Sequence, residues 1–141
     1  MGHLRAGQEI DPGDAIARGE ARGTPILVGP HVRETPLGHI HVGQQGATGL
    51  QLTVYSEELC EDARARSLLL AGIGRAARFA HPNLLTTLGV TESGGQLIAV
   101  RGDPEGATLR NVIHEAMATG RRIEPYRALY WAEQLCGALE A

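Results

Sequence analysis

Lysine is absent from this 141-residue chain, and all 13 of its basic residues are arginine. The absence excludes a lysine Schiff base and a lysine general base. It also excludes the compact ammonium charge that many phosphate sites use, because a guanidinium differs from it in shape and hydration. The sequence alone therefore excludes every mechanism that depends on a lysine amine.

Cysteine, long apolar runs and excess positive charge are also scarce. Cys60 and Cys136 lack the C-x-x-C spacing of a redox or zinc site, so we interpret both as reduced core thiols. Residues 1–23 contain no apolar run that fits a signal peptide or a membrane span. The net charge of −3 provides no basic field for nucleic acid. We predict a cytoplasmic protein, or the cytoplasmic part of a larger one, without a nucleic-acid or membrane partner.

The apolar pattern predicts one mixed α and β domain. With 43% hydrophobic residues, the chain can bury most of a small core. Residues 1–23 are rich in glycine and charge, which predicts a mobile leader, and the fold is expected to begin near Thr24. Three strand-like runs follow, separated by proline and glycine clusters, and predict an antiparallel meander at residues 26–28, 38–42 and 50–55.

A helix is expected over residues 57–80, where acidic residues precede arginines as the helix dipole favours. Its apolar face is predicted to be Leu70, Ile73, Ala77 and Ala80. Gly72 and Gly74 weaken its middle by about 1 kcal/mol each relative to alanine. Two further strands are expected at 84–90 and 96–100, joined by a glycine-bearing connection.

Two helices are expected at the end of the sequence. Thr108 is a suitable N-cap, and Gly120 a suitable C-terminal stop, for a helix with apolar residues at i, i+3, i+4, i+7 and i+8. Pro125 suits the first turn of a last helix. That helix carries an apolar stripe of Leu129, Ala132, Cys136 and Leu139.

This order of elements resembles the small lobe of bacterial eukaryote-like serine/threonine protein kinases, followed by the start of the large lobe. The resemblance covers about residues 26–141. Residues 48–55 are similar to the strand that ends in V-A-I-K, residues 81–85 to the H-P-N-I-V segment, and residues 96–109 to the fifth strand and hinge. It implies an α+β fold with a five-stranded antiparallel sheet, one packed helix and two large-lobe helices. The small lobe would span residues 24–103 and the hinge with the large-lobe start residues 104–141.

The nucleotide-pocket positions that this resemblance implies are degenerate. The phosphate-anchoring lysine falls on Tyr55 and its glutamate partner on Gly72. The glycine-rich loop falls on residues 33–40 and keeps only Gly38 and Ile40 of its pattern. At the hinge the corresponding positions are Arg101, Gly102 and Pro104; proline has no N–H for adenine. For Arg101 we expect an ion pair with Asp103 or Glu105, or else a phosphate or carboxylate ligand.

The catalytic H-R-D loop and the metal-binding D-F-G segment do not occur in the sequence, as in a domain truncated before them. We therefore expect no catalytic residue and no cofactor in this chain. The leading hypothesis is a pseudokinase-like regulatory module that binds a protein partner, or a second copy, through Leu129, Ala132, Cys136 and Leu139. The alternative is an N-terminal fragment of a kinase that binds ATP and magnesium and phosphorylates proteins when complete. A third interpretation is an unrelated small α+β protein.

The pattern His39-x-His41 puts two imidazoles on one strand face, where they could bind a metal ion. The pattern itself places no third ligand beside them. We therefore interpret the pair as two edge-strand histidines and expect no metal.

Overall fold

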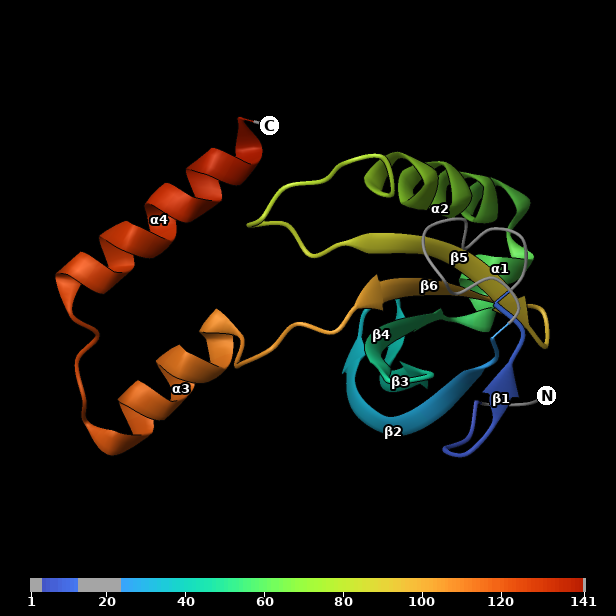
Figure 1. Ribbon diagram of the computed structural model, residues 1–141, viewed down its shortest axis with the longest axis horizontal. Coiled ribbons are helices and arrows are strands. Elements are labelled where there is room, and N and C mark those ends of the chain that lie inside the picture. Colours follow the sequence, from blue (N-terminus) through green and yellow to red (C-terminus); the bar gives the residue numbers. More distant parts are fainter. Residues whose placement is uncertain (1–3, 13–23, 141) are drawn as a thin grey trace. The chain divides into compact units, whose positions relative to one another are not determined.

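The computed structural model describes residues 4–12 and 24–140 (Figure 1). The chain divides into two compact units. The sheet unit consists of the described residues up to Ala80 together with Leu85–Asp103. The helical unit consists of His81–Leu84 and the residues from Pro104 onward. The division after Asp103 coincides with the segment where the sequence resembles a kinase hinge.

The sheet unit contains a six-stranded antiparallel sheet with strand order β1-β2-β3-β4-β6-β5. This confirms the predicted α+β class, with one strand more than expected. The bounds are β1 Glu9–Ile10, β2 Ile26–Thr35, β3 Gly38–Gln45, β4 Thr48–Tyr55, β5 Thr87–Ser93 and β6 Gln96–Gly102.

The additional strand, β1, lies in the segment that was predicted to be a mobile leader. That prediction is wrong for residues 4–12, where Leu4 and Ile10 are buried in the main core. Gly7 adopts a positive φ of 87°, which turns the chain so that Gly7 and Gln8 exchange backbone hydrogen bonds with Val28. A strand of two residues shows no periodicity, so sequence reasoning missed it. The remaining leader positions lie outside the described residues.

The two faces of β4 contact different parts of the core, as strand alternation requires. Leu50, Leu52 and Val54 face a cluster that includes the buried residues of β1, β2 and β6. Tyr55 belongs to a second cluster on the opposite face, together with Cys60, Ile73, Leu97 and Ala99. The predicted burial of Cys60 is therefore confirmed.

The single helix predicted over residues 57–80 is divided into α1 (Glu57–Glu61) and α2 (Ala63–Ala76). Asp62 separates them because it is extended and caps α2, accepting a hydrogen bond from the Ala65 amide. The predicted apolar face is wrong at Leu70, which is 38% exposed, whereas Leu69 and Ile73 pack against the sheet. Within α2, residues spaced by four therefore form the buried face.

The helical unit contains α3 (Leu109–Thr119) and α4 (Pro125–Leu139), as predicted. The Thr108 hydroxyl accepts a hydrogen bond from the Asn111 amide, and Gly120 ends α3 with a φ of 65°. No helix among the described residues is long and apolar enough to span a membrane.

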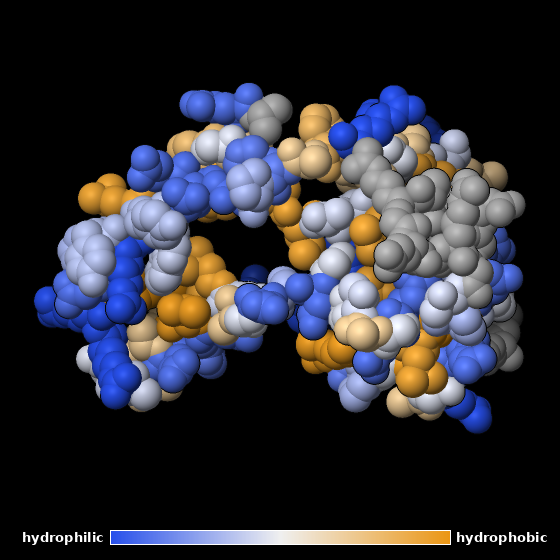
Figure 2. Space-filling model, viewed as in Figure 1, coloured by the Kyte–Doolittle hydropathy of each residue, from blue (hydrophilic) through white to orange (hydrophobic). Residues whose placement is uncertain are grey.

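Apolar side chains remain at the surface of the helical unit (Figure 2). Ala138 of α4 is buried and α3 contributes no buried residue. Cys136 is exposed, so its prediction as a core thiol is wrong. The predicted α4 stripe is exposed throughout and comprises Leu129, Ala132, Cys136 and Leu139.

Candidate functional site

A cavity of about 360 Å³ lies in the sheet unit, on the face of β4 that α2 covers. We call it the α2-side cavity. It brings together three positions that the sequence singled out, Tyr55, Gly72 and Arg101. The other lining residues are Leu37, Leu59, Ala65, Leu68, Leu69, Ile73 and Ala76. The wall is therefore apolar apart from one phenol and one guanidinium.

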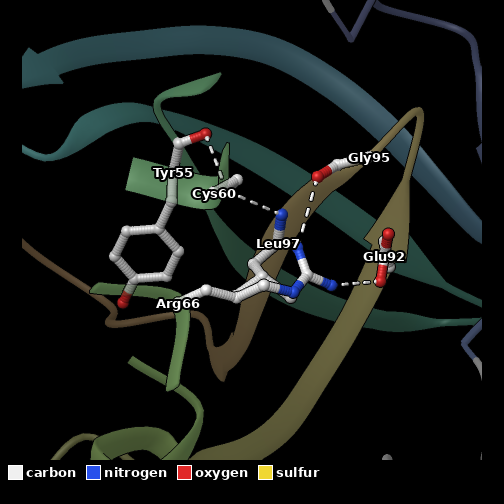
Figure 3. Close-up of polar contacts among 6 residues, drawn as sticks. All are labelled: Tyr55, Cys60, Arg66, Glu92, Gly95 and Leu97. Carbon is white, nitrogen blue, oxygen red and sulfur yellow. Dashed lines mark hydrogen bonds and ion pairs between the residues drawn. The ribbon is translucent and has the colours of Figure 1, made fainter. Parts of the chain in front are cut away.

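Tyr55 lies at the end of β4 and is held by its backbone carbonyl. That oxygen accepts hydrogen bonds from Gln96 Nε2 at 3.1 Å and from Cys60 Sγ at 3.9 Å. The Cys60 sulfur in turn accepts one from the Leu97 amide at 3.3 Å (Figure 3). These contacts fix the strand end between α1 and β6, so the phenol keeps a defined place in the cavity wall.

Among the residues that the structure describes, Arg101 is the one basic residue that lines this cavity, and none of the described acidic residues lines it. Its Nη1 donates a hydrogen bond to Thr53 Oγ1 at 2.7 Å. The expected ion pair with Asp103 does not form among the residues that the structure describes. The alternative partner, Glu105, lies in the helical unit, and that pairing stays a prediction. Thr53 shares the face of Tyr55 because strand side chains alternate, and this period-two signal could have pointed to it.

Gly72 lies on α2 and lines the cavity. A Cβ atom added there would meet no atom within 4 Å. The position is therefore open to a larger side chain, but it supplies neither charge nor hydrogen-bonding group to the cavity. The resemblance implies an acidic residue at position 72 that pairs with a base at the end of β4. Neither partner of this pair is present, because Gly72 is not acidic and Tyr55 is not basic.

Gly38 has a structural reason to be glycine at the β2–β3 turn. Its φ is 150°, and a Cβ atom there would lie 2.0 Å from the Val54 carbonyl oxygen of β4. The preceding Thr35 hydroxyl donates to the Gly38 carbonyl at 3.1 Å and accepts from the Leu37 amide at 3.3 Å. The turn is a short hairpin connection rather than a glycine-rich loop. Ile40, two residues later, is buried.

Arg66 links α2 to the β5–β6 hairpin by polar contacts (Figure 3). Its Nη2 lies 2.6 Å from Glu92 Oε2 of β5, and Nη1 donates to the Gly95 carbonyl at 3.4 Å. The pair is partly exposed, so we expect it to contribute at most about 1 kcal/mol. Its main effect is to hold α2 against the β5–β6 hairpin.

The remaining predicted positions, Gly102 and Pro104, follow Arg101 along the chain. Gly102 closes β6, where its amide donates to the Thr86 carbonyl at 2.9 Å. Pro104 begins the long segment of the helical unit and has no amide hydrogen. Neither residue lines the α2-side cavity.

A sheet of this order with a helix on one face, followed by two helices, is the architecture of a protein kinase small lobe and the start of its large lobe. Solved structures agree. The crystal structure of the Mycobacterium tuberculosis PknI kinase domain superposes with a TM-score of 0.73 at 19% identity, over 97% of this chain and 49% of that one. A double-mutant form of that domain gives 0.75 at 18% identity, over 98% and 51%.

This chain therefore has the fold of a kinase small lobe with the first large-lobe helices, and it spans about half the length of the kinase domains that it matches. No family model and no curated protein matches the sequence. The likeness in fold confirms the predicted architecture and leaves the chemistry to be argued from the side chains.

Proposed function

We propose that this chain is a pseudokinase-like interaction module that does not transfer phosphate. The observation that supports this most is the α2-side cavity: it is lined by Tyr55 and Gly72, the positions to which the resemblance assigns the anchoring lysine and its glutamate partner, and neither residue carries a charge. Phosphoryl transfer is mostly positioning and charge neutralisation by a few groups. A cavity with one guanidinium and no carboxylate cannot supply them.

The rest of the chain adds no substitute for the missing groups. The guanidinium of Arg101 already donates to Thr53. Gly38 is constrained by the Val54 carbonyl rather than kept open for phosphate. The sequence contains neither H-R-D nor D-F-G, so it offers no catalytic base and no magnesium ligand of that kind. Instead of a catalytic site, we infer that the chain uses the exposed α4 stripe of the helical unit to bind a protein partner.

One observation favours a second candidate, an N-terminal part of a serine/threonine kinase. The chain spans about half the length of the kinase domains that it matches, and the α2-side cavity is present with Arg101 in its wall. Under this alternative Arg101 would contact nucleotide phosphates in place of lysine, and residues outside this sequence would supply the base and the metal ligands.

Thermal unfolding with and without millimolar Mg-ATP distinguishes the two. A dissociation constant of 10 µM at 1 mM ligand would stabilise the folded state by about 2.7 kcal/mol, a visible rise in melting temperature. We expect no rise. A rise that Arg101→Gln abolishes would overturn the proposal in favour of the kinase fragment, and Arg110→Gln, on exposed α3, is the matched control.

A further inference from the structure

Four side chains of the β2–β3 hairpin lie on one face of the sheet, opposite to the α2-side cavity. His41 is paired with His31, and His39 is paired with Glu34. His39 and His41 are two residues apart on β3, so they point to the same side, and each residue paired directly across the ladder points there too. The result is a two-by-two array of three imidazoles and one carboxylate.

Irregular pairing of β2 makes this array possible. His31 and Glu34 are three residues apart, and in a regular strand they would point to opposite faces. The pairing shifts by one residue between His31 and Arg33, so that an extra residue is accommodated and the alternation is reset. A second shift lies between Val28 and His31. The strong curvature of β2 in Figure 1 is what such bulges produce.

Potential ligand atoms already lie close together. One donor atom each from His31, Glu34 and His39 lies within 4.8 Å of the other two. His39 Nδ1 is 3.8 Å from Glu34 Oε1. Around a tetrahedral zinc ion with bonds near 2.0–2.1 Å, donor atoms are about 3.4 Å apart. Metal binding would therefore require these side chains to rotate so that their donor atoms move closer together.

His41 supports the cluster from its buried side. Its Nδ1 lies 3.3 Å from the Gly29 carbonyl oxygen, which can only accept, so this nitrogen is the donor. Its ring meets the His31 ring edge-on, with centroids 5.5 Å apart. The His31 ring is likewise 5.5 Å from the His39 ring. His41 thus restricts the orientation of His31, as neighbours of metal ligands commonly do.

The same four side chains line a second cavity of about 290 Å³, together with Leu4, Val54 and Gln96. There is therefore room beside the donors for a fourth ligand such as water. Two imidazoles and one carboxylate with an open position are a donor set that suits zinc, whereas magnesium and calcium prefer oxygen donors.

We propose that His31, Glu34 and His39 form a binding site for a divalent transition metal ion of the zinc type, with His41 positioning His31. The sequence pattern considered only His39 and His41, which both lie on β3. The further donors of the proposed site, His31 and Glu34, lie on β2. They reach the same face only because of the bulge in β2, which the sequence pattern did not predict. A bound ion would link β2 to β3 and stiffen the hairpin.

Calorimetric titration of the full chain with zinc chloride, in a buffer that does not chelate, tests this site. We expect one ion per chain with micromolar affinity, weakened at least about tenfold in Glu34→Gln and in His31→Gln. His114→Gln, on α3, is the matched control and should stay within about twofold of the unmodified chain. Magnesium chloride should give no binding heat.

Glu34 is 77% exposed, so Glu34→Gln should leave the fold intact, and circular dichroism checks this. Hydrogen exchange gives an independent readout, because zinc should slow exchange at the amides of residues 31–41 and leave β5 unchanged. Equal zinc affinity in Glu34→Gln, His31→Gln and the unmodified chain would overturn the proposal. So would the absence of binding at about 100 µM zinc, or an equal loss of binding in His114→Gln.

Discussion

The sheet unit and the helical unit differ in how completely they cover their own apolar side chains. The sheet unit buries Ile26, Leu52 and Ile98 completely. In the described part of the helical unit the only buried residue is Ala138, while Leu129 is 71% and Leu139 is 84% exposed. Since burial contributes roughly 25 cal/mol per Å² of apolar surface, the sheet unit has a stabilising core of its own, whereas the helical unit leaves most of its apolar side chains exposed.

The same contrast appears at the two cysteines. Cys60 is buried and hydrogen-bonded between β4 and β6, whereas Cys136 is exposed on α4. An exposed thiol among leucines is typical of a surface that is covered in an assembly. The two units therefore differ in how far they bury their own apolar and thiol side chains.

The largest expected effect comes from shortening one leucine in each unit. Leu52→Ala removes a fully buried side chain of β4 and should lower the free energy of unfolding of the sheet unit by about 4 kcal/mol. Leu129→Ala should change it by less than about 0.5 kcal/mol, because that side chain is exposed. Denaturant unfolding measures both, and similar losses would mean that α4 packs as tightly as β4.

A pair of positive-φ glycines gives the next largest difference. Gly38→Ala should cost at least about 3 kcal/mol, because its Cβ would clash with the Val54 carbonyl in addition to the backbone strain. Gly120→Ala, in the helical unit, meets no atom within 4 Å and should cost only about 1–2 kcal/mol of local α3 stability. Thermal unfolding compares the two substitutions. A melting temperature unchanged by Gly38→Ala would contradict the close contact between Gly38 and the Val54 carbonyl.

Association should depend on the α4 stripe and not on apolar residues of the sheet. Leu129→Glu combined with Leu139→Glu should weaken self-association at least about tenfold, equivalent to about 1.4 kcal/mol, because charge replaces apolar contact. Leu27→Glu with Val32→Glu, two exposed residues of β2, is the matched control. Light scattering across a concentration series measures this, and an unmodified chain that stays monomeric at high concentration would contradict it.

The smallest predicted effect concerns helix glycines. Gly72→Ala should stabilise the sheet unit by about 1 kcal/mol, since α2 gains helix propensity and the new Cβ meets nothing within 4 Å. Gly137→Ala, on α4, should leave the free energy of unfolding of the sheet unit unchanged. If both substitutions raise it equally, the two units unfold as one cooperative structure.

The sequence predicted most of the fold because its longer elements carry strong local signals. Alternating apolar and polar residues predicted β4, and Thr108 and Gly120 predicted the two ends of α3. The two-residue β1 and the helix break at Asp62 were missed, because each depends on a tertiary or capping contact rather than on a period.

The candidate sites were predicted less well, because they depend on pairing between strands. Tyr55, Gly72 and Arg101 do line one cavity, but the Arg101 contact with Thr53 runs between β6 and β4. The histidine cluster requires the bulge between His31 and Arg33, where a shift of one residue decides which face carries the donor. No single segment of sequence encodes either arrangement.

We propose that the sheet unit is stable by itself, whereas the helical unit requires a protein partner or a second copy to cover α4. Hydrogen exchange of the isolated chain at two concentrations tests it most directly. We predict strong protection of β4 and β6 at both concentrations, with α4 exchanging fast when dilute and slowly when concentrated. Protection of α4 equal to that of β6 in the dilute monomer would contradict the claim.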